Sequence, residues 1–353
     1  MRCRFCQAVA PSGTAMCRVC GAPLRPATAP QPPVSAPILN VESQPVAPQL
    51  VWRAPRAMDA PRVVSATFLV PPDGEPIPAL ALENGALSLW SGTNWHDLPA
   101  PRRLTRSPAV TCAAWSPVNS RLALGDAQGA VGFHHIAFNP VRLEWMRRPF
   151  GRLDAQHGRC LALGWSGDAL LSAGSDGTVV CLENGRRDPT RWEARLVFDG
   201  YASLCALTAS PDGAWLALGG DDGALSVRRR EDDGAWTRQW SLRRAGPRVR
   251  SLAFSPNGNL LLSLHADAPA RLWAARTGHE LNTFSPASGG AFAPDSRLLA
   301  LVNGDELQVF DAWTGALLHA LSPRGGVQAL VWGSGNLLVA GADEVALWMI
   351  GTQ

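Results

Sequence analysis

The chain has 353 residues, and 46% of them are hydrophobic, which fits one large all-β domain with appendages, or two or more domains, with a sizeable core. All 32 basic residues are arginines, and the formal net charge is +3. The charge is uneven, because residues 1–60 carry a net charge of +4 and the remainder carries −1. The nearly neutral remainder argues against a broad polyanion-binding surface there.

The N-terminus lacks the pattern of a secretory signal, because no apolar segment follows Arg2 and Arg4. No apolar run approaches the roughly 18 residues that a membrane-spanning helix needs. Four of the eight cysteines form two C-x-x-C pairs and four are scattered, which differs from a secreted disulfide framework. We therefore expect a cytoplasmic protein that does not insert into a membrane.

Residues 1–24 contain the two C-x-x-C pairs, formed by Cys3 with Cys6 and by Cys17 with Cys20. Two such pairs supply four thiolates in a tetrahedron, which is the geometry of a structural zinc site. So short a segment cannot build a core, so the metal would provide most of its folding free energy. A redox dithiol is the alternative, but the βαβ context of a thioredoxin-like site is absent. The spacing predicts one structural Zn²⁺ ion.

The same segment resembles the short N-terminal zinc ribbons of many bacterial proteins. Their pattern is C-x-x-C-G, a polar spacer and C-x-x-C-G-x-x-L, and here the four cysteines, Gly21 and Leu24 match, whereas Gln7 replaces the first glycine. The resemblance implies a compact, non-catalytic module that contacts proteins or, in some cases, nucleic acid.

Residues 25–48 are rich in proline and contain Ala, Gln, Ser and Val between the prolines. Such a segment cannot form a sheet ladder or a helix and favours an extended polyproline II conformation. We predict a flexible linker between the ribbon and the larger domain, which begins at residue 49.

The stretch from Ser203 to Arg230 shows the unit from which most of the chain is built. It contains three candidate strands, Leu204–Ala209, Trp215–Leu218 and Leu225–Arg228, separated by Ser-Pro-Asp-Gly and by Gly-Gly-Asp-Asp-Gly. Proline presets φ and glycine supplies a positive φ in such turns, and Asp-Gly favours a hairpin. The unit is therefore a meander, whose faces must be covered by neighbouring copies.

Turn positions equivalent to Pro211 recur through residues 49–353 at intervals of 45, 50, 44, 45, 38 and 40 residues. An apolar run precedes and follows each of them: Pro72, Pro117, Gly167, Pro211, Pro256, Pro294 and Ser334. A period of about 40–45 residues with four strands per unit is typical of a β-propeller. Seven first strands predict seven blades.

The third strands resemble those of WD40 repeats, which close on Trp, often followed by Asp. The residues that match are Trp90, Trp273 and Trp348 in blades one, five and seven, with Val309-Phe310-Asp311 in blade six and Thr-Gly turns at Thr277-Gly278 and Thr314-Gly315. The family's Gly-His near the start of each repeat is mostly missing. The resemblance thus implies a seven-bladed WD40-like propeller with an incomplete Asp–His–Ser–Trp network in most blades, which must be stabilised mainly by apolar packing between blades.

The last blade lacks sequence for its own outer strand, because only three residues follow Leu347–Ile350. Residues Leu50–Arg53 precede blade one and have no other assignment. We predict that they pair with Val345–Ile350 as the outer strand of blade seven, which removes an open edge.

The candidate chemical groups favour structural roles. The scattered cysteines lie on predicted strands among apolar neighbours, so we expect small buried hydrophobes: Cys112, Cys160, Cys181 and Cys205. Adjacent strand residues point to opposite faces, so His134 and His135, placed at the end of a third strand, are unsuited to chelating one ion. Acidic residues at second-to-third-strand turns match positions where WD40 repeats use Asp to order the turn: Asp126, Asp176, Asp222 and Asp267. No hydrolase, zincin or P-loop motif occurs.

Arginine clusters with nearby tryptophans fall mostly in connectors or outer strands. The arginines are Arg102, Arg103, Arg106, Arg142, Arg147, Arg148, Arg186, Arg187, Arg191, Arg228, Arg229, Arg230, Arg243 and Arg244, and the tryptophans are Trp145, Trp192, Trp236 and Trp240. Such a mixture can bind RNA or an acidic protein. However, Asp188, Glu193 and Glu231–Asp233 offset much of the charge, so a solvated rim with intramolecular pairs is favoured.

These observations favour a non-enzymatic protein-interaction scaffold. The propeller would bind a protein partner within a multiprotein assembly, and the ribbon would be an auxiliary contact on its tether. The alternative is nucleic-acid binding, to RNA or DNA, through the basic ribbon region, with an affinity that falls steeply with salt. A third hypothesis, an enzyme with a site in the propeller channel, requires several acidic or histidine side chains converging there.

Overall fold

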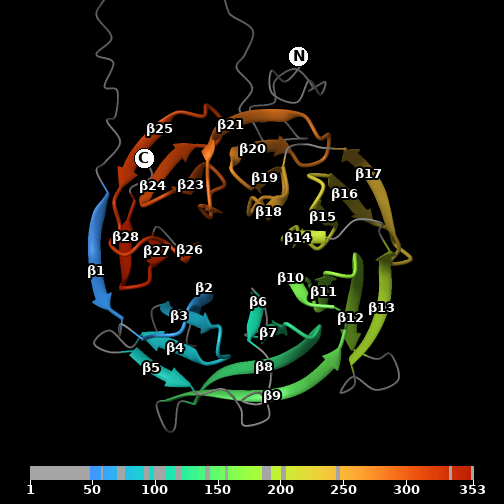
Figure 1. Cartoon of the computed structure of the whole chain (residues 1–353), viewed down its shortest axis with the longest axis horizontal. Coiled ribbons are helices and arrows are strands. Elements are labelled where there is room, and N and C mark those ends of the chain that lie inside the picture. The colour runs from blue at the N-terminus through green and yellow to red at the C-terminus, as the bar shows by residue number, and fades with distance from the viewer. Residues whose placement is uncertain are drawn as a thin grey trace, which may run out of the picture.

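The computed structural model shows a ring of seven four-stranded antiparallel sheets around a central channel (Figure 1). It describes residues 48–350, apart from 57–58, 70–75, 91–94, 99–108, 117–120, 140–143, 156–157, 185–191, 200–203, 244–246 and 334–335. Within those ranges every regular element is a strand. The predicted all-β, seven-bladed propeller is therefore confirmed. The predicted zinc ribbon and all of the predicted linker except Pro48 lie outside the described residues.

Each blade places its first strand beside the channel and adds its next strands outward (Figure 1). The first strands are β2 (Val63–Leu69), β6 (Val110–Trp115), β10 (Cys160–Ser166), β14 (Leu204–Ala209), β18 (Val249–Phe254), β22 (Gly289–Phe292) and β26 (Ala329–Trp332). The second strands are β3 (Ile77–Leu82), β7 (Arg121–Asp126), β11 (Ala169–Gly174), β15 (Trp215–Gly220), β19 (Leu260–His265), β23 (Leu298–Asn303) and β27 (Asn336–Ala340). Blades on both sides cover the second strands, and β11, β15 and β19 are therefore buried along their whole length.

The third and fourth strands complete each blade toward the periphery. The third strands are β4 (Leu87–Trp90), β8 (Ala130–Asn139), β12 (Thr178–Asn184), β16 (Leu225–Arg230), β20 (Ala268–Ala274), β24 (Glu306–Asp311) and β28 (Glu344–Met349). The fourth strands of blades one to six are β5 (Trp95–Leu98), β9 (Glu144–Asp154), β13 (Trp192–Asp199), β17 (Trp236–Leu242), β21 (Glu280–Pro286) and β25 (Leu317–Leu321).

The outer strand of blade seven comes from the other end of the described chain. β1 (Gln49–Pro55) pairs antiparallel with β28, with Leu50 opposite Trp348 and Arg53 opposite Ala346, and a bulge lies between Leu50 and Trp52. Figure 1 shows β1 in blue beside the red strands of blade seven. This pairing joins the two ends of the ring through a backbone ladder, and it leaves no unpaired edge on β28.

The core consists of seven apolar clusters, each of which spans two neighbouring blades. The cluster between blades seven and one, for example, joins Val63 and Leu80 to Leu338 and Val345. The sequence interpretation expected stability to rest mainly on apolar packing between blades, and the distribution of the core agrees with that.

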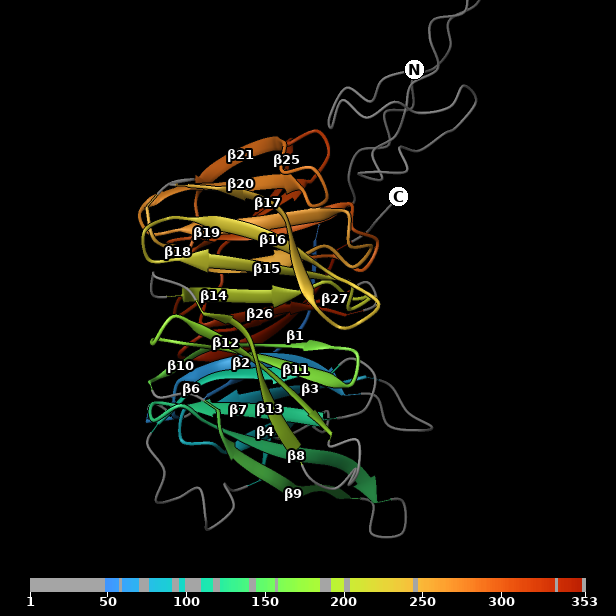
Figure 2. The same cartoon turned by 90° about the vertical axis from the view of Figure 1, so that its right-hand side faces the viewer.

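Blade two departs from the predicted pattern. β8 and β9 contain 10 and 11 residues, and this hairpin extends beyond its neighbours at the edge of the ring (Figure 2). As a result, His134 and His135 lie in the middle of β8 and not at its end. Periodicity had marked where the third strand begins but not how far the hairpin continues. In the described ranges, no helix is long and apolar enough to cross a bilayer.

Candidate functional site

The predicted zinc ligands Cys3, Cys6, Cys17 and Cys20 lie outside the described residues. Among the residues that the structure does describe, no three His, Cys, Asp or Glu side chains are grouped so that they could hold a metal ion. In the predicted His-His pair, His134 is buried and His135 is exposed, so the two imidazoles point to opposite faces of β8, as the strand period requires.

The acidic residues at second-to-third-strand turns have structural roles. The Asp126 carboxylate accepts hydrogen bonds from two backbone amides of its own turn, at 2.9 and 3.0 Å. Asp176 and Asp222 each accept one from the amide two residues on, at 3.1 and 3.0 Å. Asp267 has a φ of 54°, in the left-handed region that Asp tolerates better than most residues. The predicted turn-ordering role is confirmed where these bonds are made.

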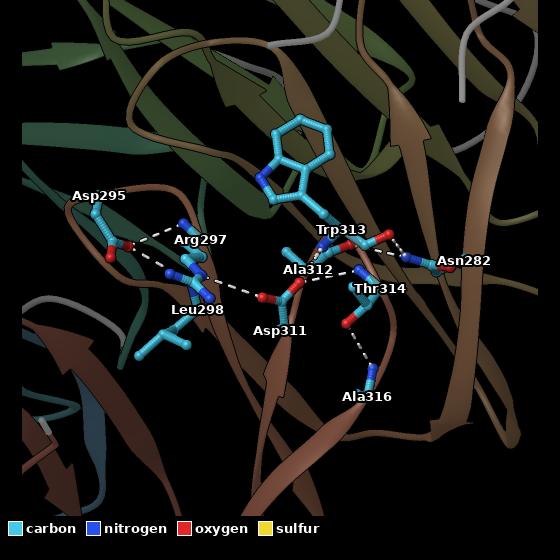
Figure 3. A network of polar contacts seen from close by, with 9 residues as sticks. All are labelled: Asn282, Asp295, Arg297, Leu298, Asp311, Ala312, Trp313, Thr314 and Ala316. Carbon is cyan, nitrogen blue, oxygen red and sulfur yellow. Dashed lines mark hydrogen bonds and ion pairs between the residues drawn. The ribbon is translucent and has the colours of Figure 1, made fainter. Parts of the chain in front are cut away.

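A second carboxylate network orders the turn that follows the third strand of blade six (Figure 3). One oxygen of Asp311 accepts the backbone amides of Trp313 and Thr314 at 3.0 and 2.9 Å, and the other lies 3.2 Å from Nε of Arg297. Nδ2 of Asn282, on β21 of blade five, donates to the Ala312 carbonyl at 2.7 Å. The carboxylate is thus committed to holding the turn, and the Asn282 bond ties blade five to blade six.

Blade five contains a buried polar chain that the sequence interpretation missed. Nε1 of Trp273 donates to Oγ of Ser263 at 2.8 Å, and this oxygen lies 3.0 Å from Nε2 of His265. Nδ1 of His265 lies 3.0 Å from the Pro247 carbonyl. The histidine comes from the end of β19, not from a Gly-His at the start of the repeat. The signal that could have found it is the Ser-x-His spacing, which puts both side chains on one face of the strand.

The arginines are more strongly engaged than a solvated rim implies. Arg147 is half-buried, and its guanidinium bonds the Gly85 carbonyl and lies 3.2 Å from Nε2 of His134. Arg152 pairs with Asp126 at 2.9 Å. Arg152 lies outside the predicted clusters. Among the predicted members, Arg230 forms an intramolecular pair with Glu183 at 3.2 Å, whereas Arg147 meets an imidazole and a carbonyl. The predicted cluster members Arg102, Arg103, Arg106, Arg142, Arg186, Arg187, Arg191 and Arg244 lie outside the described residues.

The central channel contains a cavity of about 210 Å³ between the first strands of blades one to five. Its lining comprises Val64, Thr111–Ala113, Leu161–Leu163, Cys205–Leu207 and Arg250–Leu252. This described lining includes thiols, hydroxyls and one guanidinium but no carboxylate or imidazole, so the groups that the channel-enzyme hypothesis requires do not meet here. Cys112 and Cys205 are only half-buried, which corrects the expectation that all four scattered thiols are buried, because inner strands turn one face to the channel.

A larger groove, of about 790 Å³, lies between blades three and four. β13 contributes Glu193–Arg195 to one wall, and residues 230–234, which begin at the end of β16, form the other. Two contacts cross between the blades: Glu183 pairs with Arg230 at 3.2 Å, and Nη2 of Arg195 donates to the Gly234 carbonyl at 2.9 Å. These contacts fix the separation of the two walls, so the groove is a built feature of the blade interface.

The groove is electronegative. Its lining holds five carboxylates and two guanidiniums, an excess of three negative charges. Arg230 is paired with Glu183, whereas Glu193 and Asp232 are exposed on opposite walls. Low-dielectric walls that carry one sign of charge focus the field and attract groups of the opposite sign. The arrangement suits a cationic segment. The Cys181 thiol in the lining donates to the Glu183 carboxylate at 3.2 Å, but burial, together with that carboxylate, raises the pKa of Cys181 to about 12, so the thiol stays protonated and is a poor nucleophile.

The residues that line this groove come from separate stretches of the sequence. In the sequence, Glu193 and Glu231–Asp233 stand beside arginine clusters, and this position favours a role as neutralising charges. Nothing in the sequence indicated that β13 faces residues 230–234 across a blade boundary. The available signal was the propeller count itself, which makes blades three and four adjacent.

Comparison with known sequences supports the WD40 character of part of the ring. The model of the family described as "Anaphase-promoting complex subunit 4 WD40 domain" matches residues 207–291, from blade four to the first strand of blade six. "Anaphase-promoting complex subunit cdc20" of Dictyostelium discoideum is 25% identical over 245 residues, which are 68% of this chain and 47% of that protein. The chain thus spans about half the length of this curated relative.

Solved structures share the fold. The β-propeller domain of Myceliophteria thermophila Cps50 (Swd1) superposes with a TM-score of 0.66 and 13% identity, over 86% of this chain and 100% of that one. A chain of the Mitotic Checkpoint Complex superposes with a TM-score of 0.64 and 17% identity, over 93% and 99%. At these identities the likeness establishes the β-propeller fold.

Proposed function

We propose that this protein is a non-enzymatic protein-interaction scaffold whose propeller binds a cationic segment of a partner protein in the groove between blades three and four. The observation that carries the proposal is the groove itself, which combines rigid walls with an excess of three negative charges. Pre-organised walls lower the entropy cost of binding, and complementary charge raises the association rate. The similar proteins support it, since their names place them in an anaphase-promoting complex and in the Mitotic Checkpoint Complex.

The edge strand β13 adds a second means of recognition. It is the outer strand of blade three, so its outward edge has no neighbouring strand in its sheet. Leu196 on this strand is 59% exposed, next to the groove residues Glu193–Arg195. An extended segment that pairs with the edge gains backbone hydrogen bonds, while its arginine or lysine side chains reach the carboxylates and an apolar side chain covers Leu196.

The N-terminal cysteines are proposed as a second module on the basis of their spacing. Cys3, Cys6, Cys17 and Cys20 would bind one structural Zn²⁺ ion through four thiolates. Zinc content of the purified full-length protein should be one ion per chain, and Cys17→Ser should lose it because three ligands do not close the site. Cys205→Ser, outside the segment, is the matched control. Equal zinc content in the Cys17→Ser protein would remove this part of the proposal.

The proposed partner class is tested by affinity purification of the full-length protein from its native cells, with and without nuclease treatment. A protein partner should stay bound after nuclease digestion. The alternative, nucleic-acid binding, draws support from the net charge of +4 in residues 1–60. It predicts retention on DNA or RNA at low salt that falls steeply as salt rises. Loss of all bound protein after nuclease treatment would favour that alternative over the scaffold.

A further inference from the structure

Two thiols on neighbouring blades lie side by side at the channel. Sγ of Cys112, on β6 of blade two, is 3.3 Å from Sγ of Cys160, on β10 of blade three. A disulfide bond has an S–S length of about 2.05 Å, so the sulfurs are about 1.3 Å farther apart than in a disulfide. This proximity is set by the packing of two first strands, which are separated by 48 positions in the sequence.

The surroundings hold the two sulfurs together. Gly125, on β7, has no side chain, and a Cβ built there would lie 2.5 Å from Sγ of Cys160 and 2.7 Å from Sγ of Cys112. The two sulfurs therefore fill the space that any larger residue would take. The Thr111 hydroxyl bonds the Cys160 carbonyl, which ties the backbones of the two blades together beside the thiols. Oγ of Ser172 lies 3.3 Å from Sγ of Cys160.

The pair is also open to a small reagent from one side. Cys112 is half-buried and lines the channel cavity of about 210 Å³, whereas Cys160 is buried behind it. The thiol of Cys112 donates a hydrogen bond to Cys160. This bond, with burial, raises the pKa of Cys112 well above its usual range. The same bond lowers the pKa of Cys160, although burial acts in the opposite direction there. One proton is thus held between the two sulfurs, and loss of the other leaves a thiolate that the neighbouring S–H stabilises.

We propose that Cys112 and Cys160 form a redox modification site, a dithiol that a small peroxide entering the channel oxidises to an interblade disulfide. The bond would join the first strands of blades two and three, a boundary that the described structure holds with side-chain packing and hydrogen bonds. It is independent of the proposed partner groove, which lies between blades three and four.

The reaction balances with the peroxide as the oxidant. The shared proton moves from Cys112, which lines the channel, to Cys160, and the Cys112 thiolate attacks one peroxide oxygen. The O–O bond breaks, and hydroxide leaves, which produces a sulfenic acid on Cys112. The second thiol gives its proton to that hydroxide and attacks the sulfenic sulfur. The S–S bond forms, the S–O bond breaks, and the departing hydroxide takes up the proton first lost by the pair. Two thiols and one hydrogen peroxide become one disulfide and two waters, and an external thiol reverses the change.

The test is treatment of the reduced full-length protein with hydrogen peroxide, followed by alkylation, proteolysis and mass spectrometry without reductant. We expect a crosslinked peptide pair that contains Cys112 and Cys160, lighter by two hydrogens than the two free peptides and lost on addition of dithiothreitol. Peptide mapping separates this product from oxidation of the N-terminal cysteines. A map in which Cys112 and Cys160 both remain alkylated, or in which Cys112 is joined to Cys205, would overturn the proposal.

Matched variants keep the test independent of folding. Cys181→Ser and Cys205→Ser should retain the crosslink, because these two thiols bond carboxylates, Glu183 and Asp221. Cys112→Ser and Cys160→Ser should each abolish it. Oxidation should also raise the Tm of the wild type and leave that of Cys112→Ser unchanged, since only the wild type can constrain its unfolded state across blades two and three. An equal Tm shift in both proteins would show that another thiol is responsible.

Discussion

Arg147 places Nη2 3.2 Å from Nε2 of His134 in the interior of blade two. His134 is 1% exposed, and burial, together with the charge of Arg147, lowers the pKa of its imidazole to about 3. Burial also lowers the pKa of Arg147, to about 10, so the guanidinium is charged at neutral pH. Arg147 also bonds the carbonyl of Gly85 in blade one. The charged Arg147, held beside the neutral imidazole of His134, therefore connects blade two to blade one.

Stability should therefore fall when the solution becomes acidic. The pKa of a histidine in an unfolded chain is about 6.5. Between about pH 6.5 and pH 3, His134 is therefore protonated in the unfolded chain but neutral in the folded chain. The contribution is intact above about pH 6.5, and about 2 kcal/mol is lost by pH 5. His134→Gln keeps an acceptor for Arg147 but does not titrate. It should lose about 2 kcal/mol less than the wild type between pH 7 and pH 5, measured by urea unfolding.

The control for this prediction is the neighbouring residue on the same strand. His135 is exposed, so His135→Gln should show the same pH dependence as the wild type. If the His134→Gln profile ran parallel to that of the wild type, the buried imidazole would not be the source of the acid sensitivity.

The Trp273–Ser263–His265 chain predicts that the free energy of unfolding depends on the hydroxyl of Ser263. Ser263→Ala leaves the indole N–H and the imidazole Nε2 without their shared partner in a buried site, which should cost about 1–3 kcal/mol. Ser241→Ala, at an exposed position of β17 in the adjacent blade, should change the free energy of unfolding by less than about 0.5 kcal/mol. Comparable urea midpoints for the two variants would contradict a stabilising role for the chain.

The pairing of β1 with β28 predicts that blade seven is sensitive to a charge at one face of β1. Ala54 is 1% exposed, so Ala54→Asp would bury an unpaired carboxylate and should cost about 3–5 kcal/mol. Val51→Asp is the matched control, because Val51 lies on the same strand and is 50% exposed. Limited proteolysis should release the N-terminal segment faster from Ala54→Asp. Equal cleavage rates would mean that β1 is dispensable for closing the ring.

The fold was largely predictable because turn chemistry is local. The Pro-Asp-Gly and Asp-Gly turns delimit Leu204–Ala209 and the strands that follow it, and the structure shows Leu204–Ala209 with the predicted bounds. Repetition then supplied the ring, since one meander cannot bury its faces and seven can. The length of β8 and β9 escaped prediction because nothing in the period limits how far an outer hairpin extends.

The candidate sites were poorly predictable because they are made between blades. Glu183 meets Arg230 across 47 positions of sequence, and Cys112 meets Cys160 across 48. A hydrophobic pattern places each residue on its strand, but the rotation of one blade against the next decides which side chains touch. The sequence therefore shows the groove carboxylates as charges and the two thiols as buried apolar residues. It does not show which residues they contact.

The central claim is most directly tested by quantitative affinity purification of full-length protein from its native cells with Glu193→Arg and Asp232→Arg, each of which reverses a charge on one wall of the groove. Asp305→Arg is the control, because Asp305 is also exposed but lies on blade six. We predict that recovery of the partner protein falls about tenfold in each groove variant, which corresponds to about 1.4 kcal/mol, and is unchanged in the control. Equal recovery of the same partners by the wild type and both groove variants would contradict the account.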